Sequence, residues 1–158
     1  MPMKILKKLL GVLGTAGIIG ILLVNLYPIL TGGKIYQIQT GSMEPAIKTG
    51  SYVLIRPTEE IKTGQVIMFD QVGYPVPIVH RVVAINAGGR TLTTRGDANG
   101  TEDASIDRSQ VRGAVTDVFS QHGVYHRPYQ IGTGIFCLAL VGLSLANSSK
   151  KGGHKKDA

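Results

Sequence analysis

The sequence predicts a mainly β protein, in which a small antiparallel β-domain is flanked by two transmembrane α-helices. The helices are predicted because residues 9–30 and 131–147 carry no charged side chain. The domain is predicted because short segments rich in β-branched and aromatic residues alternate with turn residues between these two runs. A chain of 158 residues has room for one modest domain together with its membrane segments.

The first apolar run, "LLGVLGTAGIIGILLVNLYPIL", is long enough to cross a bilayer. A helix over this run would span roughly 30 Å, which is the thickness of the hydrocarbon core. A cleaved signal peptide has a shorter apolar core that ends at a small-residue site. Gly14, Ala16 and Gly17 could imitate such a site, but apolar residues continue well beyond them. The pattern therefore favours a retained anchor over a cleaved signal peptide.

The second run, "IGTGIFCLALVGLSLAN", is near the lower length limit for a membrane span. Two alternatives remain open, a buried core helix and a helix that lies in the membrane interface. The basic segment "SSKKGGHKKDA" follows directly and offers no apolar face for packing. These flanking residues favour a second span.

The net charge of +7 is concentrated next to the apolar runs. Residues 31–149 contain ten basic and nine acidic residues, so nearly all of the excess lies at the two ends. Lysines beside membrane spans are typical of the cytoplasmic side, and this distribution argues against nucleic acid as a partner. The sequence thus predicts a multi-pass protein of the cell membrane, with these segments: a cytoplasmic N-terminus (1–8), a transmembrane helix (9–30), an extracytoplasmic β-domain (31–130), a second transmembrane helix (131–147) and a basic cytoplasmic tail (148–158).

The strands of the domain are predicted from β-branched and aromatic residues bounded by turn chemistry such as Lys48-Thr49-Gly50 and Gly73-Tyr74-Pro75. No helical periodicity interrupts them, which favours antiparallel pairing. The predicted strands cover residues 34–39, 51–57, 65–70, 76–85, 90–97 and 111–119.

Ser42 is the first residue that could carry chemistry. It follows Thr40-Gly41 at the end of a predicted strand, and Pro45 prevents the strand from continuing. A nucleophile needs such exposure and a neighbouring backbone N–H that can hold an oxyanion. A serine that only stabilises a turn through its hydroxyl would fit the same local pattern.

His80 interrupts an otherwise apolar strand, "VPIVHRVVAI". With a period of two residues, His80 shares a face with Ile78 and Val82, and Arg81 lies on the opposite face. Imidazole exchanges protons near neutral pH, so His80 is a candidate general base. A hydrogen-bonded structural histidine is the alternative.

An acidic loop follows this strand, and a catalytic triad needs one carboxylate from it to orient the histidine. The loop "TTRGDANGTEDASID" carries four acids, Asp97, Glu102, Asp103 and Asp107. Asp97 could instead be a turn former, and several of these acids could simply be solvated.

Metal and disulfide chemistry are not indicated by the sequence. Cys137 is the single cysteine and lies inside the second apolar run, so the chain cannot form an internal disulfide. The four histidines lack ligand spacing. We therefore expect no metal and no organic cofactor.

Taken together, Gly-Ser-Met-x-Pro, then His-Arg on a strand, then Gly-Asp-x-Asn with a further Asp six residues after the first resemble the type I signal peptidases. The order and spacing are similar to the Ser/His branch of the endoplasmic reticulum, of archaea and of some Gram-positive bacteria (the SipW-like enzymes). The common bacterial branch has Lys where this chain has His80. The resemblance covers residues 38 to about 115 and the preceding anchor, and does not distinguish a bacterial from an archaeal source.

The resemblance implies a serine endopeptidase that removes signal peptides from secretory preproteins after an Ala-x-Ala pattern. Ser42 would be the nucleophile, His80 the general base and Asp103 the third member, with Asp97 as a supporting or alternative acid. The backbone N–H of Ser42 and the hydroxyl of Thr40 would hold the oxyanion.

The resemblance also implies that residues 36–40 and 77–80 bind the substrate as an added strand, a form of β-augmentation. Within them, the expected substrate-binding residues are Ile38, Gln39, Thr40, Ile78 and Val79. Ile47 and Met68 are candidates for pocket walls or for plain core. The client preproteins and any complex subunits are not indicated by the sequence.

Three alternatives compete with this hypothesis. Lys48 or Lys62 could act as a different base, although both lie in turns. A related serine protease with a narrow client is conceivable, but a self-cleaving repressor would need a DNA-binding helix-turn-helix and no anchors. A membrane-bound β-domain that binds secreted peptides without cleaving them would leave Ser42 dispensable.

Overall fold

The computed structural model describes residues 2–86 and 88–146. The predicted basic tail, 148–158, and the last residue of the second apolar run lie outside the described residues. The chain divides into two compact units. One unit is Leu26–Tyr125, and the other combines Met1–Asn25 with His126–Ala158.

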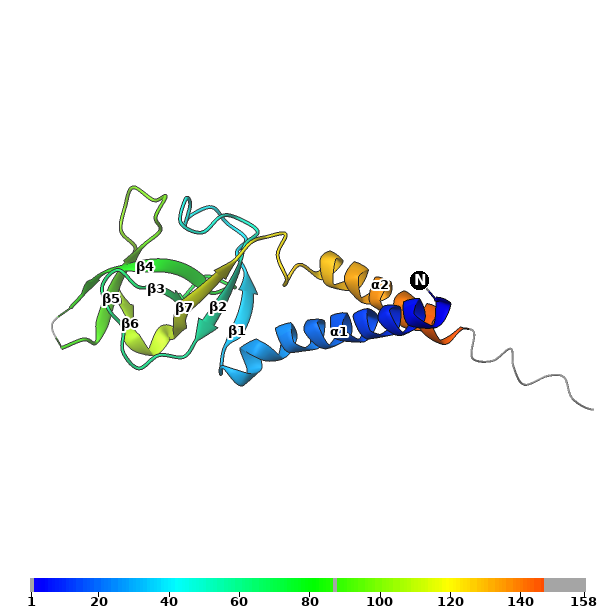
Figure 1. Cartoon of the computed structure of the whole chain (residues 1–158). Coiled ribbons are helices and arrows are strands. Elements are labelled where there is room, and N and C mark those ends of the chain that lie inside the picture. Colours follow the sequence, from blue (N-terminus) through cyan, green and yellow to red (C-terminus); the bar gives the residue numbers. More distant parts are fainter. Residues whose placement is uncertain (1, 87, 147–158) are drawn as a thin grey trace, which may run out of the picture. The chain divides into compact units, whose positions relative to one another are not determined.

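The first unit is built on a seven-stranded sheet with the order β1-β2-β7-β3-β4-β5-β6, and every neighbouring pair is antiparallel (Figure 1). The mainly β, antiparallel prediction is confirmed. The strands are β1 (Lys34–Gln37), β2 (Tyr52–Arg56), β3 (Val66–Phe69), β4 (Ile78–Ile85), β5 (Thr91–Arg95), β6 (Ile106–Asp107) and β7 (Val111–Phe119), and a short 3₁₀ helix, η1 (Arg108–Gln110), precedes β7.

Each predicted strand is present, and five of the six are two or three residues shorter than the apolar pattern suggested. β6 was not predicted, because two residues leave no alternating pattern to recognise. Asp107 ends β6 and caps η1, since its carboxylate accepts hydrogen bonds from the Ser109 N–H and hydroxyl at 2.8 and 2.6 Å. The same two donors lower the pKa of Asp107.

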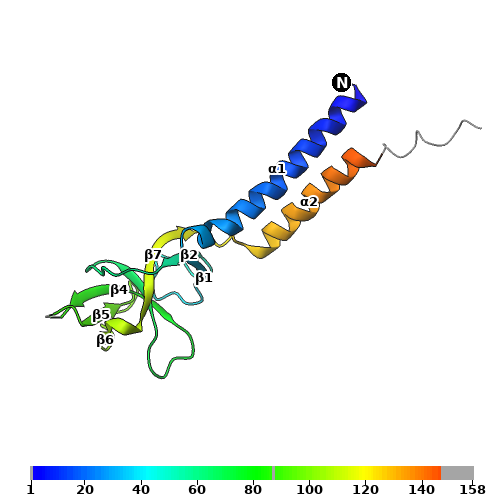
Figure 2. The ribbon, with the colours of Figure 1, turned by 90° about the horizontal axis from the view of Figure 1, so that it is seen from below.

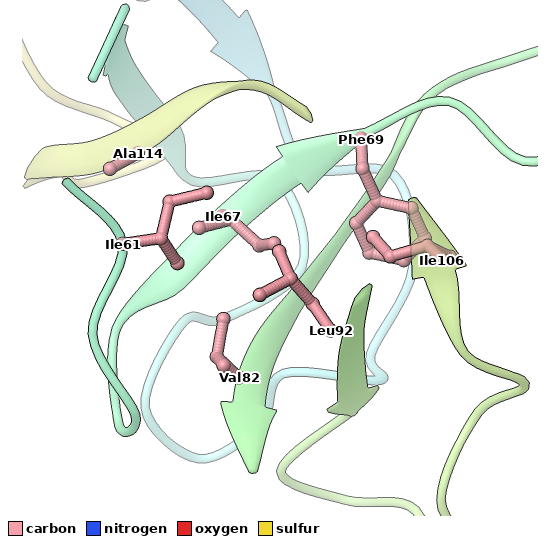
Figure 3. Packing of buried hydrophobic residues seen from close by; sticks show 7 residues of the cluster. All are labelled: Ile61, Ile67, Phe69, Val82, Leu92, Ile106 and Ala114. Atoms are coloured by element: carbon pink, nitrogen blue, oxygen red, sulfur yellow. The ribbon is translucent and has the colours of Figure 1, made fainter. Parts of the chain in front are cut away.

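Both faces of the sheet bury apolar side chains. Ile67 and Phe69 of β3 join one cluster with Ile61, Val82, Leu92, Ile106 and Ala114 (Figure 3). Met68, which lies between them in sequence, belongs to a second cluster with Ile38, Met43, Ile47, Val53 and Ile55. This alternation is the expected consequence of the two-residue period of a strand. The second cluster lies under the segment that carries Ser42.

The second unit contains α2 (Arg127–Leu145) and the part of α1 (Met3–Leu30) up to Asn25, and these two helices run side by side (Figure 2). Both are long and apolar enough to cross a membrane. Each begins before its charge-free run, so Lys4, Lys7 and Lys8 are helical and Pro128 opens α2.

Glycines bring the two helices close together. A Cβ on Gly14 would lie 2.7 Å from the Cys137 carbonyl oxygen, and one on Gly17 would collide with the Cys137 sulfur. Small residues at such crossings let helix backbones approach within a membrane.

Candidate active site

Ser42 lies in the loop between β1 and β2, on top of a buried residue. Its neighbour Met43 is 1% exposed and packs in the second cluster with Ile38 and Ile47. Ser42 itself remains partly exposed. The buried Met43 side chain thus anchors the loop in the core and leaves Ser42 at the surface.

Glu44 closes the same loop. Its carboxylate accepts hydrogen bonds from the Thr49 backbone N–H at 3.1 Å and the Thr49 hydroxyl at 2.8 Å. These bonds, the backbone one first, lower the pKa of Glu44. The segment after Ser42 is therefore fixed by core packing and by a local side-chain bridge.

The loop after β5 presses directly against Ser42. The Ala98 N–H donates to the Ser42 carbonyl oxygen at 2.9 Å. A Cβ on Gly96 would lie 2.6 Å from the same carbonyl oxygen and 2.8 Å from the Asn99 side-chain nitrogen. Only glycine at position 96 permits this approach.

His80 lies in the middle of β4, opposite Ile67 of β3, and is 7% exposed. Its Nδ1 is 2.6 Å from Asp103 Oδ2. With Nδ1 directed at the carboxylate, Nε2 is the ring nitrogen left to exchange a proton with a reacting group.

Asp103 is held by β5 as well as by His80. Its Oδ2 accepts a hydrogen bond from the Thr94 hydroxyl at 2.8 Å, and its backbone N–H donates to the Thr94 carbonyl at 2.8 Å. Thr94 is fully buried. A triad acid needs such fixed orientation, because its task is to hold the imidazole in one position.

Asp97 has a different partner. It binds Arg81 in a bidentate ion pair, with Nε–Oδ1 and Nη2–Oδ2 distances of 2.8 and 2.6 Å. Arg81 Nη1 also donates to the Gly64 carbonyl at 2.8 Å. Hydrogen bonding to Arg81 lowers the pKa of Asp97, against the opposing effect of burial, and the same bond raises the pKa of Arg81.

A cavity of about 720 Å³ brings the candidate residues together. Ser42, His80 and Asp103 all line it. Among the described residues no hydrogen bond joins Ser42 to His80. Hydrogen bonds between a nucleophile and its base often shorten only when substrate binds. The Thr40 and Ser42 hydroxyl oxygens are 3.5 Å apart, a long contact that nevertheless places both hydroxyls side by side.

The walls of the cavity include the two segments that the sequence singled out. All five expected substrate-binding residues line it: Ile38, Gln39, Thr40, Ile78 and Val79. Met68 lines it as well as packing in the core, whereas Ile47 is buried in the second cluster and does not reach the cavity.

The sequence did not predict several residues that line the cavity or hold Asp103. Thr94 could have been found, because it shares a strand face with the apolar Leu92 and is polar at a buried position. Gln71 and Tyr74 line the cavity, and their loop positions gave no signal, whereas Asn99, which also lines it, belongs to the Gly-Asp-x-Asn motif. Residues 2–86 and 88–146 contain no cluster of three His, Cys, Asp or Glu side chains that could hold a metal ion.

Comparison with known proteins adds independent information. The model of the Peptidase S24-like family matches residues 31–116, more than half of the chain. The signal peptidase complex catalytic subunit SEC11 of Tuber melanosporum is 32% identical over 84 residues, which cover 46% of this chain and 45% of the relative. The human subunit SEC11C is 33% identical over 85 residues, which cover 49% and 44%.

The chain spans about half the length of the curated relatives it matches. The resemblance to signal peptidases of the endoplasmic-reticulum type, expected from three short motifs, is confirmed by these relatives. The chain belongs to the Peptidase S24-like family.

Proposed function

We propose that this chain is a membrane-anchored serine endopeptidase that removes N-terminal signal peptides from secretory preproteins after small residues. The observation that carries the proposal is the shared cavity, which is lined by Ser42 and by a His80 ring whose Nδ1 is 2.6 Å from Asp103. The relatives, whose names describe catalytic subunits of a signal peptidase complex, supply the substrate class.

The chemistry is acyl transfer. Ser42 Oγ attacks the scissile carbonyl carbon while His80 Nε2 takes the hydroxyl proton, and Asp103 stabilises the resulting imidazolium. The Ser42 N–H and the Thr40 hydroxyl donate to the oxyanion. His80 then protonates the leaving amine, which frees the mature protein. Water, deprotonated by His80, releases the signal peptide from Ser42 and restores the hydroxyl.

The sheet offers two open backbone edges for an extended substrate. β1 is the first strand of the sheet, so its pairing with β2 leaves the opposite edge for another strand. In β4, pairing with β5 starts at Arg81, whereas residues 78–80 pair on their other side with β3. Both edges flank the cavity, which supports binding of the cleavage region by β-augmentation.

We infer that α1 and α2 both span the membrane, with residues 31–130 on the extracytoplasmic side. Lysines in the first turns of α1 support a cytoplasmic start for this helix. The close packing of Gly17 on Cys137 supports a retained α1 rather than a cleaved leader. Membrane-impermeant thiol labelling of intact cells tests the orientation: a Thr101→Cys variant should react, and labelling of Ala146→Cys from outside would refute it.

Cleavage of a preprotein with an Ala-x-Ala site by the full chain in liposomes tests the proposed activity. Wild type should cut after the last small residue, as mapped by product mass, and Ser42→Ala should abolish the cut. Ser105→Ala is the matched control, because Ser105 is a loop serine whose hydroxyl bonds Thr93 at 3.2 Å outside the cavity. Undiminished cleavage by Ser42→Ala would reject the proposal and favour a peptide-binding domain.

A further inference from the structure

A second cavity lies on the helix pair. Its volume is about 650 Å³, and it shares no lining residue with the cavity that contains Ser42. Seven of its lining residues belong to α1 and one to α2: Lys7, Lys8, Gly11, Val12, Thr15, Ala16, Ile19 and Ser144. We call this cavity the helix groove.

The hydroxyl groups of the helix groove are directed to their own backbones. The Thr15 hydroxyl donates to the Gly11 carbonyl at 2.8 Å, and the Ser144 hydroxyl donates to the Val141 carbonyl at 2.6 Å. Hydroxyl groups that already donate to the backbone do not require a hydrogen-bond acceptor from a ligand. The length of the groove therefore presents mainly hydrocarbon, from Val12, Ala16 and Ile19.

One end of the helix groove is cationic. Lys7 and Lys8 line it within the first two turns of α1, and the first turn carries no acidic residue. No ion pair of the described residues includes either lysine. The amide groups at the start of a helix add positive potential to the same end.

The dimensions of the helix groove match one leaflet of a bilayer. From Lys8 to Ile19, α1 rises about 16 Å. Half of the hydrocarbon thickness is about 15 Å. A ligand that fills the groove thus needs an anionic head at the lysines and an apolar tail as long as one leaflet is deep.

We propose that the helix groove binds one anionic phospholipid. Its headgroup phosphate lies between the Lys7 and Lys8 ammonium groups, and one acyl chain lies along Val12, Ala16 and Ile19. A zwitterionic lipid fits less well, because its own ammonium group neutralises the phosphate and repels the lysines. A free anion would leave the apolar length of the groove unused. The proposal rests on the membrane location of the helices and is independent of catalysis at Ser42.

Native mass spectrometry of the full chain in detergent, titrated with phosphatidylglycerol or phosphatidylcholine, tests the proposal. Wild type should retain one phosphatidylglycerol at least about ten-fold more tightly than phosphatidylcholine. The Lys7→Gln/Lys8→Gln variant should bind phosphatidylglycerol about thirty-fold more weakly, since each lysine near an anionic lipid contributes about 1 kcal/mol. Lys4→Gln/Lys34→Gln, which loses the same charge outside the groove, is the matched control and should change the affinity less than about two-fold.

A second variant separates a fitted groove from plain surface charge. Ala16→Phe keeps every charge and fills the apolar length with a side chain at an exposed helix position. It should weaken phosphatidylglycerol binding at least about five-fold, because the acyl chain loses its contact area. Equal affinities of the two double variants, equal affinities of wild type for the two lipids, or full affinity in Ala16→Phe would each overturn the proposal. Circular dichroism confirms folding, and the comparison of lipids on wild type decides the matter if a variant unfolds.

Discussion

Asp97 and Asp103 lie six residues apart on one loop and face different basic side chains. His80 and Arg81 are consecutive on β4, so their side chains leave opposite faces of the strand. Asp103 meets His80 on one face, and Asp97 meets Arg81 on the other. The alternation of a single strand thereby separates the proposed catalytic pair from a pair that fixes the loop.

Asparagine at each position should distinguish these two roles. Asp103→Asn leaves the His80 ring without its orienting carboxylate, and kcat should fall about 10³- to 10⁴-fold with little change in thermal stability. Asp97→Asn leaves Arg81 with a weaker partner and should lower stability by about 1–2 kcal/mol while activity survives at low temperature. The measurement is kcat/KM together with the unfolding midpoint in detergent. A larger loss of kcat in folded Asp97→Asn than in Asp103→Asn would contradict the assignment.

The Arg81–Asp97 pair should also appear in the pH dependence of stability. Hydrogen bonding to Arg81 holds the folded pKa of Asp97 below its unfolded value. The unfolded chain therefore binds more protons as the solution is acidified, so the stability from this pair is complete above the unfolded pKa of about 3.9 and is lost as the pH falls through the folded pKa. The difference in unfolding midpoint between wild type and Asp97→Asn should shrink steadily below about pH 4. A constant difference down to pH 2 would contradict this account.

At the scale of elements, the contact between the loop after β5 and the loop of Ser42 determines where the proposed nucleophile lies. The Ala98 N–H donates to the Ser42 carbonyl oxygen, and Gly96 lies close to the same oxygen because it has no Cβ. Two segments more than fifty residues apart are thereby held together at the backbone of Ser42.

A methyl group at this contact should displace Ser42. Gly96→Ala places a Cβ 2.6 Å from a backbone oxygen, which cannot yield as a flexible side chain would. We expect kcat to fall about 10- to 100-fold, because small misplacements of reacting groups are costly. Gly100→Ala is the matched control in the same loop, since nothing lies within 4 Å of its added Cβ. Equal kcat values for the two variants would show that the contact does not position the serine.

The helix pair allows an equivalent comparison. Gly17→Ala directs a methyl group into the Cys137 sulfur, whereas Gly20→Ala meets nothing within 4 Å. Both changes raise helix propensity by about 1 kcal/mol, so any difference between the variants reports packing. The thermal midpoint in detergent should fall by several degrees in Gly17→Ala and stay the same or rise in Gly20→Ala. A normal midpoint in Gly17→Ala would mean that α1 and α2 do not pack closely.

Elements with a strong periodic signal were predictable, and contacts between distant segments were not. Charge-free runs predicted both helices, and β-branched alternation predicted six of the seven strands. Short motifs in the sequence named Ser42 and His80 as candidates, and both line one cavity. The resemblance favoured Asp103 over Asp97, but which of the two contacts His80 depends on the pairing of β4 with β5, which no local pattern encodes. The role of Gly96 likewise depends on the approach of a segment remote in sequence.

At the scale of the whole molecule, the chain combines a peptidase-family β-domain with two apolar helices. Under the proposed function, confinement to the membrane brings the serine to substrates that emerge from the same bilayer. Such confinement raises the effective concentration of substrate without adding any contact. The central claim is that Ser42 and His80 act there as one catalytic unit.

Cleavage kinetics of Ser42→Ala, His80→Ala and the double variant test this claim most directly. Residues that act as a unit are strongly non-additive, so each single change should lower kcat/KM by at least about 10³-fold and the double variant should be no worse than the singles. The assay uses one preprotein in liposomes, with circular dichroism to confirm folding. Substantial activity in Ser42→Ala, or a double variant whose loss equals the product of the single losses, would contradict the account.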